Sequence, residues 1–391
     1  MSSSKLVRRA AKSVAANVLH YTGLRRAIAA ARRLRAGGRR VLILSYHRVV
    51  EDFTGALQRS IPGLLISQET FRRQLLDLRE GGYDFLPLSA ALDVLAGRKR
   101  ARNDVCVVTF DDGYRDVYRS GLPVLKELGI PATMYLPSGL IGTDERFIHD
   151  RLFHLFQLVQ QRQFQPVYAA LPATAAAVLV PLTKGTLAPA LAVDLFLRDH
   201  STQLARRCLE ALSEQLGGGP ELIPEQGDLM SWDEVRAMIA GGVDMGAHTV
   251  THTVLPLEEP ERAEWEIRAS KAEIENRTGR RCLDFAYCNG WYSDELIRIL
   301  AEAGFRSAVT TEDRTNRIGG DPFTLKRKVL WEDFSVGFDG TYSSPLTGCQ
   351  MDDVFTSLGA GTVVIGHKPQ RASALGGGLF SEPNIAIHGG A

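Results

Sequence analysis

Two adjacent carboxylates follow an apolar run in the segment Thr109-Phe110-Asp111-Asp112-Gly113-Tyr114. A strand that leads into such residues places them at the carboxyl edge of a parallel sheet, where α/β proteins build their sites. Adjacent carboxylates repel each other unless a cation, a proton or a hydrogen-bond network separates their roles. Read alone, Asp-Asp-Gly is also typical of a turn in which Asp111 caps the following helix.

Two histidines four residues apart, His248 and His252, follow a second strand-like segment, Val243 to Ala247. Both imidazoles can converge on one ion if the segment turns helically, although a pair of polar loop histidines is an equally ordinary interpretation. Together with one carboxylate they would form a facial triad with coordination positions open for water and substrate. A further histidine, His367, ends the segment Thr362 to Gly366, and a strand-end imidazole on the same face could protonate a leaving group.

The elements that must position these residues alternate between strands and helices from Val41 onward. The predicted strands include near-continuous apolar runs, which are typical of strands buried on both faces. They are Val41–Tyr46, Val105–Phe110, Ala132–Leu136, Val243–Ala247, Leu283–Tyr287, Arg306–Thr310 and Thr362–Gly366. The predicted helices between them begin at Ser67, at the capping box of Ser231 and Glu234, near Glu258 and at Ser293. This alternation favours about seven parallel strands in a barrel or a doubly wound sheet.

The chain divides into four predicted regions. Residues 1–40 form a basic, amphipathic helical arm, and residues 41–137 and 229–370 form the α/β body. Residues 138–228 interrupt the alternation with Ala-, Leu- and Gln-rich sequence and are expected to be a mostly helical insertion. The Gly-rich residues 371–391 are expected to form a flexible tail.

The order of these motifs resembles that of the polysaccharide deacetylases, and Ser45-Tyr46-His47-Arg48-Val49 is similar to the first strand of their exopolysaccharide branch. The resemblance covers roughly residues 41–137 and 229–370. It implies a distorted (β/α) barrel with fewer than eight repeats. It also implies roles: Asp112, His248 and His252 as metal ligands, Asp111 as general base and His367 as general acid.

The segment Phe285-Ala286-Tyr287-Cys288-Asn289-Gly290 departs from the family pattern, which usually reads Arg-Pro-Pro-Tyr-Gly. Ala286 stands where an Arg would orient the base, and we hypothesise that Arg327 partly replaces it. Cys288 replaces a Pro and is either a soft ligand or nucleophile or, as we favour, a small buried filler. The residues expected to contact substrate or to support it are His47, Tyr114, Tyr287, Asn289, Gly290, Trp291 and Arg327. For His47 a structural role is equally plausible, and Trp291 and Tyr292 could stack on a sugar or simply pack.

The net charge of +1 conceals a strong asymmetry. The first 50 residues contain twelve Lys or Arg and no Asp or Glu, so the rest of the chain has 34 basic and 45 acidic side chains. The arm could lie on an anionic membrane, or it could pack as a solvated arm on the acidic body. Nucleic acid is not an expected partner, because the body is acidic and has no recognition motif. The oligomeric state is left open.

Five cysteines without paired spacing indicate free thiols, and neither a membrane span nor a secretory signal is apparent. We therefore expect a cytoplasmic protein, and membrane association through the arm would place it at the inner membrane face. The resemblance implies a hydrolase that removes N-acetyl groups from N-acetylhexosamine units of a polysaccharide or lipid-linked glycan. The divalent metal expected is zinc, although nickel, cobalt or iron suits the same ligands. The alternatives are an O-acetyl esterase or small-amide deacylase, and a degenerate glycan-binding accessory protein of exopolysaccharide assembly.

Overall fold

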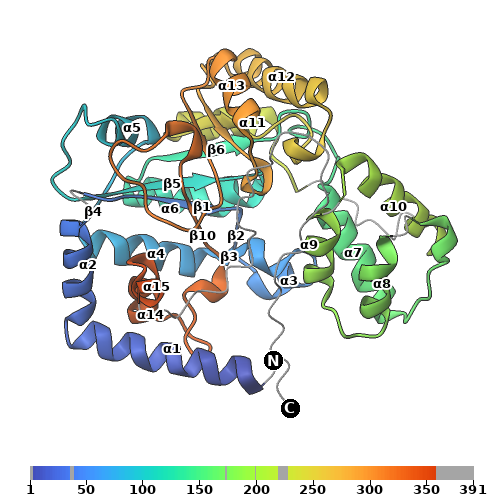
Figure 1. The fold of residues 1–391 in the computed structure, drawn as a ribbon, viewed down its shortest axis with the longest axis horizontal. Coiled ribbons are helices and arrows are strands. Elements are labelled where there is room, and N and C mark those ends of the chain that lie inside the picture. Colours follow the sequence, from blue (N-terminus) through green and yellow to red (C-terminus); the bar gives the residue numbers. More distant parts are fainter. Residues whose placement is uncertain (1–2, 36–38, 172–173, 199, 219–227, 358–391) are drawn as a thin grey trace.

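The structure is a computed structural model that describes residues 3–35, 39–171, 174–198, 200–218 and 228–357. Seven parallel strands pair in the order β10-β1-β5-β6-β7-β8-β9, and β4 adds to β5 (Figure 1). Their bounds are β1 Val41–Tyr46, β4 Tyr83–Phe85, β5 Asp104–Phe110, β6 Ala132–Leu136, β7 Val243–Ala247, β8 Asp284–Ala286, β9 Ser307–Val309 and β10 Lys328–Val329. The predicted distorted (β/α) barrel is therefore confirmed. The predicted strand at 362–366, His367 and the tail at 371–391 lie outside the described residues.

The sheet curls until its two edges meet. Leu325, three residues before β10, forms a parallel bridge with Val309 in β9. The Thr310 N–H donates to the Leu325 carbonyl over 2.7 Å, and the Leu325 N–H donates to the Ala308 carbonyl over 3.0 Å. Because β10 also pairs with β1, this segment joins the first and last strands of the curled sheet.

The period-two alternation of the strands separates two cores. In β1, Leu42 and Leu44 belong to the cluster that also contains helix residues, whereas Val41 and Ile43 belong to a smaller cluster. The smaller cluster also includes Val107, and its members come from β1, β5, β6, β8, β9, α5 and the segment at Leu325, so it fills the interior of the curled sheet. Residues that continue this inward-facing set beyond a strand end therefore enter the mouth of the barrel.

Helices connect the strands, and apart from α5, whose apolar side chains pack into the interior cluster, they cover the outside of the sheet (Figure 1). They are α4 Gln68–Glu80, α5 Leu88–Leu95, α6 Leu122–Leu128, α11 Trp232–Ala240, α12 Pro260–Thr278 and α13 Asp294–Glu302. The predicted caps are confirmed, since Ser67 accepts from the Thr70 N–H and Ser231 forms a full capping box with Glu234. A small parallel pair, β2 Arg48–Val50 and β3 Leu65–Ser67, flanks the short helix α3 Phe53–Leu57.

In the described part of residues 138–228, four α-helices gather beside the barrel mouth, on the right of Figure 1. They are α7 Ile148–Gln161, α8 Ala175–Thr183, α9 Pro189–Arg198 and α10 Thr202–Gln215. They enclose a hydrophobic core of their own, which includes Phe156, Phe196 and Leu209. We call this group the helical insertion.

The N-terminal arm forms two helices, α1 Ser3–Tyr21 and α2 Leu24–Arg35, which run along the lower and left edges of Figure 1. Ala16 and Leu19 of α1 pack with Leu346 and Cys349 of α14 Ser344–Met351 and with residues of α15 Val354–Ser357. The arm therefore packs against the body through a small core of its own. Among the described residues, we find no helix with the length and apolar character needed to cross a membrane.

The separate core of the insertion can be tested by removing one buried ring. Phe196 is fully buried, so a Phe196→Ala variant should lower the free energy of unfolding by about 3–5 kcal/mol. Leu191 lies in the same helix but is 44% exposed, so Leu191→Ala is the matched control and should have little effect. Chemical denaturation measures both, and equal losses in the two variants would contradict a packed core around Phe196.

Candidate active site

The strand-end carboxylate Asp111 points into the barrel because it continues an inward-facing set. Val105 and Val107 face the interior, so residue 111, an even number of positions further on, lies on the same face. There the Arg327 guanidinium, fully buried, donates two hydrogen bonds of 2.7 Å, one to each oxygen of Asp111. We hypothesised that Arg327 replaces the arginine of the family pattern. Its guanidinium indeed forms a bidentate ion pair with Asp111.

The remaining donors of Arg327 are also satisfied. Its Nε donates to the Thr310 carbonyl over 2.9 Å, and its Nη1 donates to Thr109 Oγ1 over 3.2 Å. Burial disfavours the charged form of Asp111, but Arg327 outweighs burial and holds the pKa of this carboxyl below its usual value. Asp111 is therefore ionised at neutral pH. Its Oδ2 also accepts a bond of 3.4 Å from the Ser45 hydroxyl, whereas Oδ1 retains a second lone pair that can accept another hydrogen bond.

The next carboxylate, Asp112, lies against the two predicted histidines. Its Oδ1 is 3.1 Å from Nε2 of His252 and 3.6 Å from Nε2 of His248. The same oxygen is buried and has no hydrogen-bond partner of normal geometry among the described residues. His248 Nδ1 is bonded to the Ala286 carbonyl over 2.7 Å, which leaves Nε2 of this ring directed at Asp112.

These three side chains fit a divalent cation. A carboxylate oxygen and two imidazole nitrogens converge on one space, which is the donor set of many zinc and iron sites. Burial lowers the pKa of His248 to about 4, so this imidazole is neutral and can act as a ligand at pH 7. Burial would also lower the pKa of His252, but the Asp112 carboxylate outweighs burial and raises it.

Cys288 lies beside this cluster, and its Sγ comes within 4.8 Å of ligand atoms of His248 and His252. It is 3.8 Å from Nδ1 and 3.9 Å from Nε2 of His248, however, and such nearly equal distances place it off the axis of the Nε2 lone pair. Burial also raises the pKa of the thiol well above its usual value. The geometry favours Cys288 as a buried filler against the imidazole, with Asp112 as the third donor.

The loop that carries both histidines is held by a residue that the sequence did not single out. Glu266 of α12 is fully buried and accepts the N–H groups of Val250 and Thr251 over 2.7 and 3.0 Å, and the Thr251 hydroxyl over 2.7 Å. Thr249 Oγ1 accepts the Thr253 N–H over 3.2 Å. These bonds fix the turn that brings His252 back toward His248.

The backbone is strained at the same place. Asp112, Thr249, His252 and Asn289 all have positive φ angles, between 56° and 74°, which non-glycine residues rarely adopt. Such conformations persist only where the surrounding structure determines them, and they cluster at functional sites. Here all four follow the carboxyl ends of strands.

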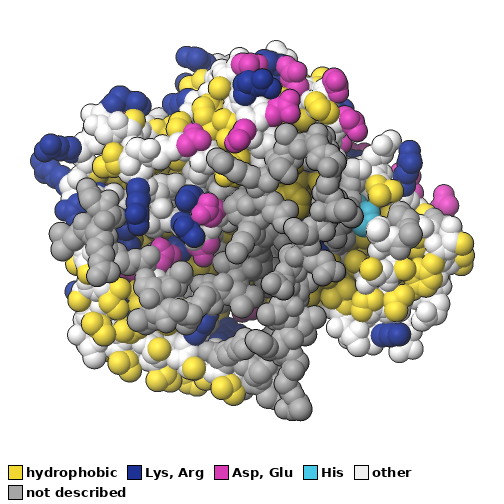
Figure 2. Space-filling model, in the orientation of Figure 1, with side chains coloured by type: hydrophobic (Ala, Val, Ile, Leu, Met, Phe, Trp, Pro, Cys, Tyr) yellow, Lys and Arg dark blue, Asp and Glu magenta, His cyan; other side chains and the backbone are white. Residues whose placement is uncertain are grey.

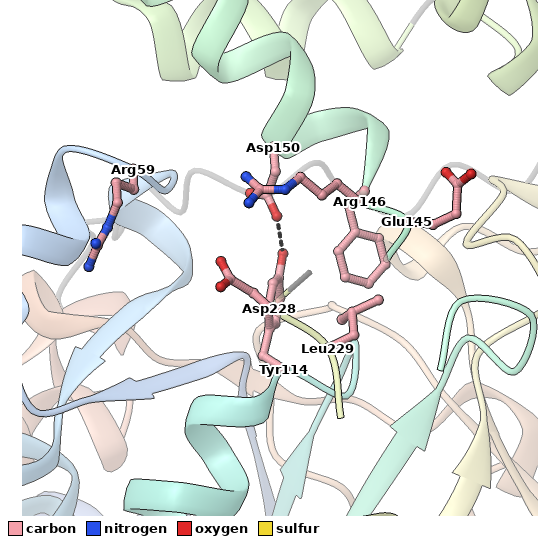
Figure 3. Close-up of a pocket in the computed structure, with 8 residues that line it drawn as sticks. Arg59, Tyr114, Glu145, Arg146, Asp150, Asp228 and Leu229 are labelled. Atoms are coloured by element: carbon pink, nitrogen blue, oxygen red, sulfur yellow. Dashed lines mark hydrogen bonds between the residues drawn. The ribbon is translucent and has the colours of Figure 1, made fainter. Parts of the chain in front are cut away.

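A second group that the sequence did not single out comes from the start of the insertion. Phe147 and His149 have rings whose centroids lie 4.9 and 5.5 Å from that of His252. The hydroxyl of Tyr114 donates to Asp150 over 2.7 Å and lies 2.9 Å from Nε2 of His149. Figure 3 shows Tyr114 and Asp150 in a small pocket that Phe147 also lines.

The remaining predicted residues are distributed around the mouth or the core. His47 faces Asp111, with Nε2 3.9 Å from Oδ2, and remains partly exposed. Gly290 has a φ of 73°, and a Cβ there would meet Thr311 at 2.3 Å, so only glycine fits. Trp291 is 8% exposed. Tyr287 is buried in the core and its hydroxyl donates to the Phe323 carbonyl, which corrects the predicted substrate contact for this side chain.

Comparison with known proteins agrees with this geometry. Residues 98–171 and 198–308 match a family described as polysaccharide deacetylase. This part of the chain is therefore similar to the polysaccharide deacetylases. The poly-beta-1,6-N-acetyl-D-glucosamine N-deacetylase of Staphylococcus epidermidis is 29% identical over 134 residues, which are 32% of this chain and 44% of that protein. The protein of the same name from Staphylococcus aureus is 25% identical over 134 residues, which cover 32% of this chain and 43% of that protein.

A solved structure is also similar to this chain. IcaB from Ammonifex degensii superposes with a TM-score of 0.51 and 21% identity, over 81% of this chain and 98% of that one. This likeness supports the fold. The curated relatives are matched over less than half of their length. The similarity therefore concerns one part of each relative and not the whole protein.

The support that Glu266 gives to the histidine loop can be tested through metal affinity. In Glu266→Gln the amide oxygen can still accept the two backbone N–H groups, but the amide N–H₂ then faces the Thr251 hydroxyl and the Arg262 guanidinium. The charge-assisted bond from Arg262 is lost, so the loop should loosen. We expect Zn²⁺ affinity to fall by about 10–100-fold, measured by competition with a chromophoric chelator. The matched control is Glu264→Gln, an exposed carboxylate of the same helix that pairs with Arg268. Equal affinity in the two variants would contradict the role of Glu266.

Proposed function

We propose that this chain is a metal-dependent N-deacetylase acting on N-acetylhexosamine units of a polysaccharide or lipid-linked glycan. The observation that carries the proposal is the pairing of Asp111 with Arg327 directly beside the Asp112, His248 and His252 cluster. The names of the staphylococcal relatives point to the same class of substrate. Zinc is the metal that we propose, because one carboxylate and two imidazoles suit it, and nickel, cobalt or iron would suit them too.

Asp112, His248 and His252 would hold the metal. A divalent ion bound there supplies Lewis acidity, which activates water and polarises an amide carbonyl. Asp111 would accept the proton that the water loses, since it is ionised and keeps a free lone pair on Oδ1. The new C–O bond forms as the C–N bond breaks, and the amine must gain a proton as acetate is released.

The group that protonates the amine remains a prediction, because His367 lies outside the described residues. His47 faces Asp111 and is suited to orient the substrate or the base. The cytoplasmic location also remains a prediction. Within the described residues the five cysteines are free and buried, which agrees with the free thiols that were expected.

The separate roles of the two carboxylates give the first test. Asp112→Ala and His248→Ala should abolish retention of a stoichiometric metal, because each removes a donor. Asp111→Asn should retain the metal and lower acetate release by about 10²–10⁴-fold, because the amide cannot accept the proton. Metal analysis and an acetate assay on N-acetylated glucosamine oligosaccharides measure the two effects. If the parent chain bound no divalent metal and released no acetate, the glycan-binding alternative would take precedence.

The Asp111–Arg327 pair gives a second test, because removal of one partner leaves a buried charge without compensation. Arg327→Ala should lower the free energy of unfolding by about 3–5 kcal/mol and also reduce turnover. Arg327→Met combined with Asp111→Asn should recover much of the stability and stay inactive. Chemical denaturation and the acetate assay separate the two effects. Unchanged turnover in Arg327→Ala would show that Asp111 needs no partner.

A further inference from the structure

Helix α1 presents an apolar face to the solvent. Five large apolar residues of α1 and the start of α2 are exposed, and we call them the α1 stripe. They are Val7 (67% exposed), Val14 (59%), Val18 (56%), Tyr21 (78%) and Leu24 (49%). Val7, Val14, Val18 and Tyr21 are spaced seven, four and three residues apart, which keeps them on one side of α1, and Leu24 begins α2 just beyond them. Figure 2 shows a row of hydrophobic side chains along the lower edge of the molecule, where Figure 1 places α1.

The opposite face of α1 is already occupied by the body of the protein. Ala16 and Leu19 are buried in the small core shared with α14 and α15. Ser13 Oγ accepts the Phe338 N–H over 3.1 Å, and Arg9 Nε donates to the Val336 carbonyl over 3.2 Å. The helix is thus anchored through one face, and the α1 stripe is a second apolar face that this packing leaves outside.

The charges of the two arm helices are of one sign, although the body already neutralises part of them, since Arg9 lies 3.4 Å from Asp333 and Arg25 lies 3.4 Å from Asp352. Neither α1 nor α2 contains an acidic residue, and the first 50 residues carry twelve Lys or Arg. Every residue of α1 that is described as exposed is uncharged, whereas Arg9 and Lys12 lie at intermediate exposure toward the body. Arg26, next to Leu24 at the start of α2, is exposed. An apolar strip on a helix whose charged residues are all basic, with Arg26 exposed just beyond its end, is the pattern of a helix that lies in the interface of an anionic membrane.

A second copy of this chain fits the stripe less well. A symmetric contact would bring two arms of the same positive charge together, with no acidic residue in either helix to compensate them. Phosphate-bearing lipid headgroups can pair with the cations of the arm that stay exposed, such as Arg26, and the acyl region accepts valine, leucine and tyrosine side chains.

We propose that the α1 stripe docks on the surface of an anionic lipid bilayer, with α1 lying in the plane of the interface. The body, in which acidic side chains outnumber basic ones, would face the water. This inference concerns where the protein sits and is independent of the chemistry proposed for the barrel.

The test is flotation of the full chain with vesicles of phosphatidylcholine alone or with an equal part of phosphatidylglycerol. We expect the chain to float with the anionic vesicles, and a Val7→Ser, Val14→Ser, Val18→Ser variant to lose at least tenfold in vesicle affinity. The matched control is Val167→Ser, which removes a residue 61% exposed in the insertion and should float like the parent chain. Equal thermal melting of all forms shows that the surface changes leave the fold intact.

A direct readout follows from the buried native cysteines. Because all five are buried, an environment-sensitive fluorophore should label Val14→Cys selectively. Its emission should shift to the blue with anionic vesicles if the stripe enters the interface. The proposal is overturned if the chain does not float, if the triple variant floats as well as the parent, or if the fluorophore does not respond. A concentration-dependent dimer that the triple variant loses, without vesicle binding, would assign the stripe to a second copy.

Discussion

The buried ion pair between Asp111 and Arg327 is the interaction on which the rest of the site depends. A lone carboxylate inside the barrel would lose its hydration and would tend to take up a proton. Arg327 prevents this with two 2.7 Å bonds, and it reaches Asp111 only because Leu325 to Val329 joins β9 to β1. The segment from Leu325 to Val329 therefore closes the sheet and also carries Arg327, the residue that keeps the proposed base ionised. The small side chain of Ala286, also in the interior, leaves room for this arrangement.

The neighbouring cluster shows how the fold maintains strained backbone. Asp112 and His252 hold positive φ angles that cost free energy, and a stable turn there requires bonds from outside the loop. Glu266 supplies them from α12 through three hydrogen bonds, and the Ala286 carbonyl orients His248. The two proposed histidine ligands are thus fixed by groups on other elements, as metal-binding side chains usually require.

The sequence predicts the parts of this structure that depend on local pattern. Continuous apolar runs identify β1 and β5, the Ser231 capping box identifies the start of α11, and strand-end polar residues identify Asp111 and His248. It cannot identify Glu266, because a buried carboxylate within a charged helix has the same local pattern as a solvated one. Arg327 could only be hypothesised, since its partner lies 216 residues away and the pairing is a product of tertiary closure.

The helical insertion illustrates the same limit and also changes how the site should be viewed. Its composition predicts helices but does not indicate any functional residue. The rings of Phe147 and His149 nevertheless pack against the ring of His252. Tyr114 links them to the loop that carries Asp111 and Asp112, through its bonds with His149 and Asp150. Residues on both sides of the mouth therefore fix one proposed ligand, so movement of the insertion relative to the barrel would disturb the cluster. The insertion is part of the site, although its core is separate from that of the barrel.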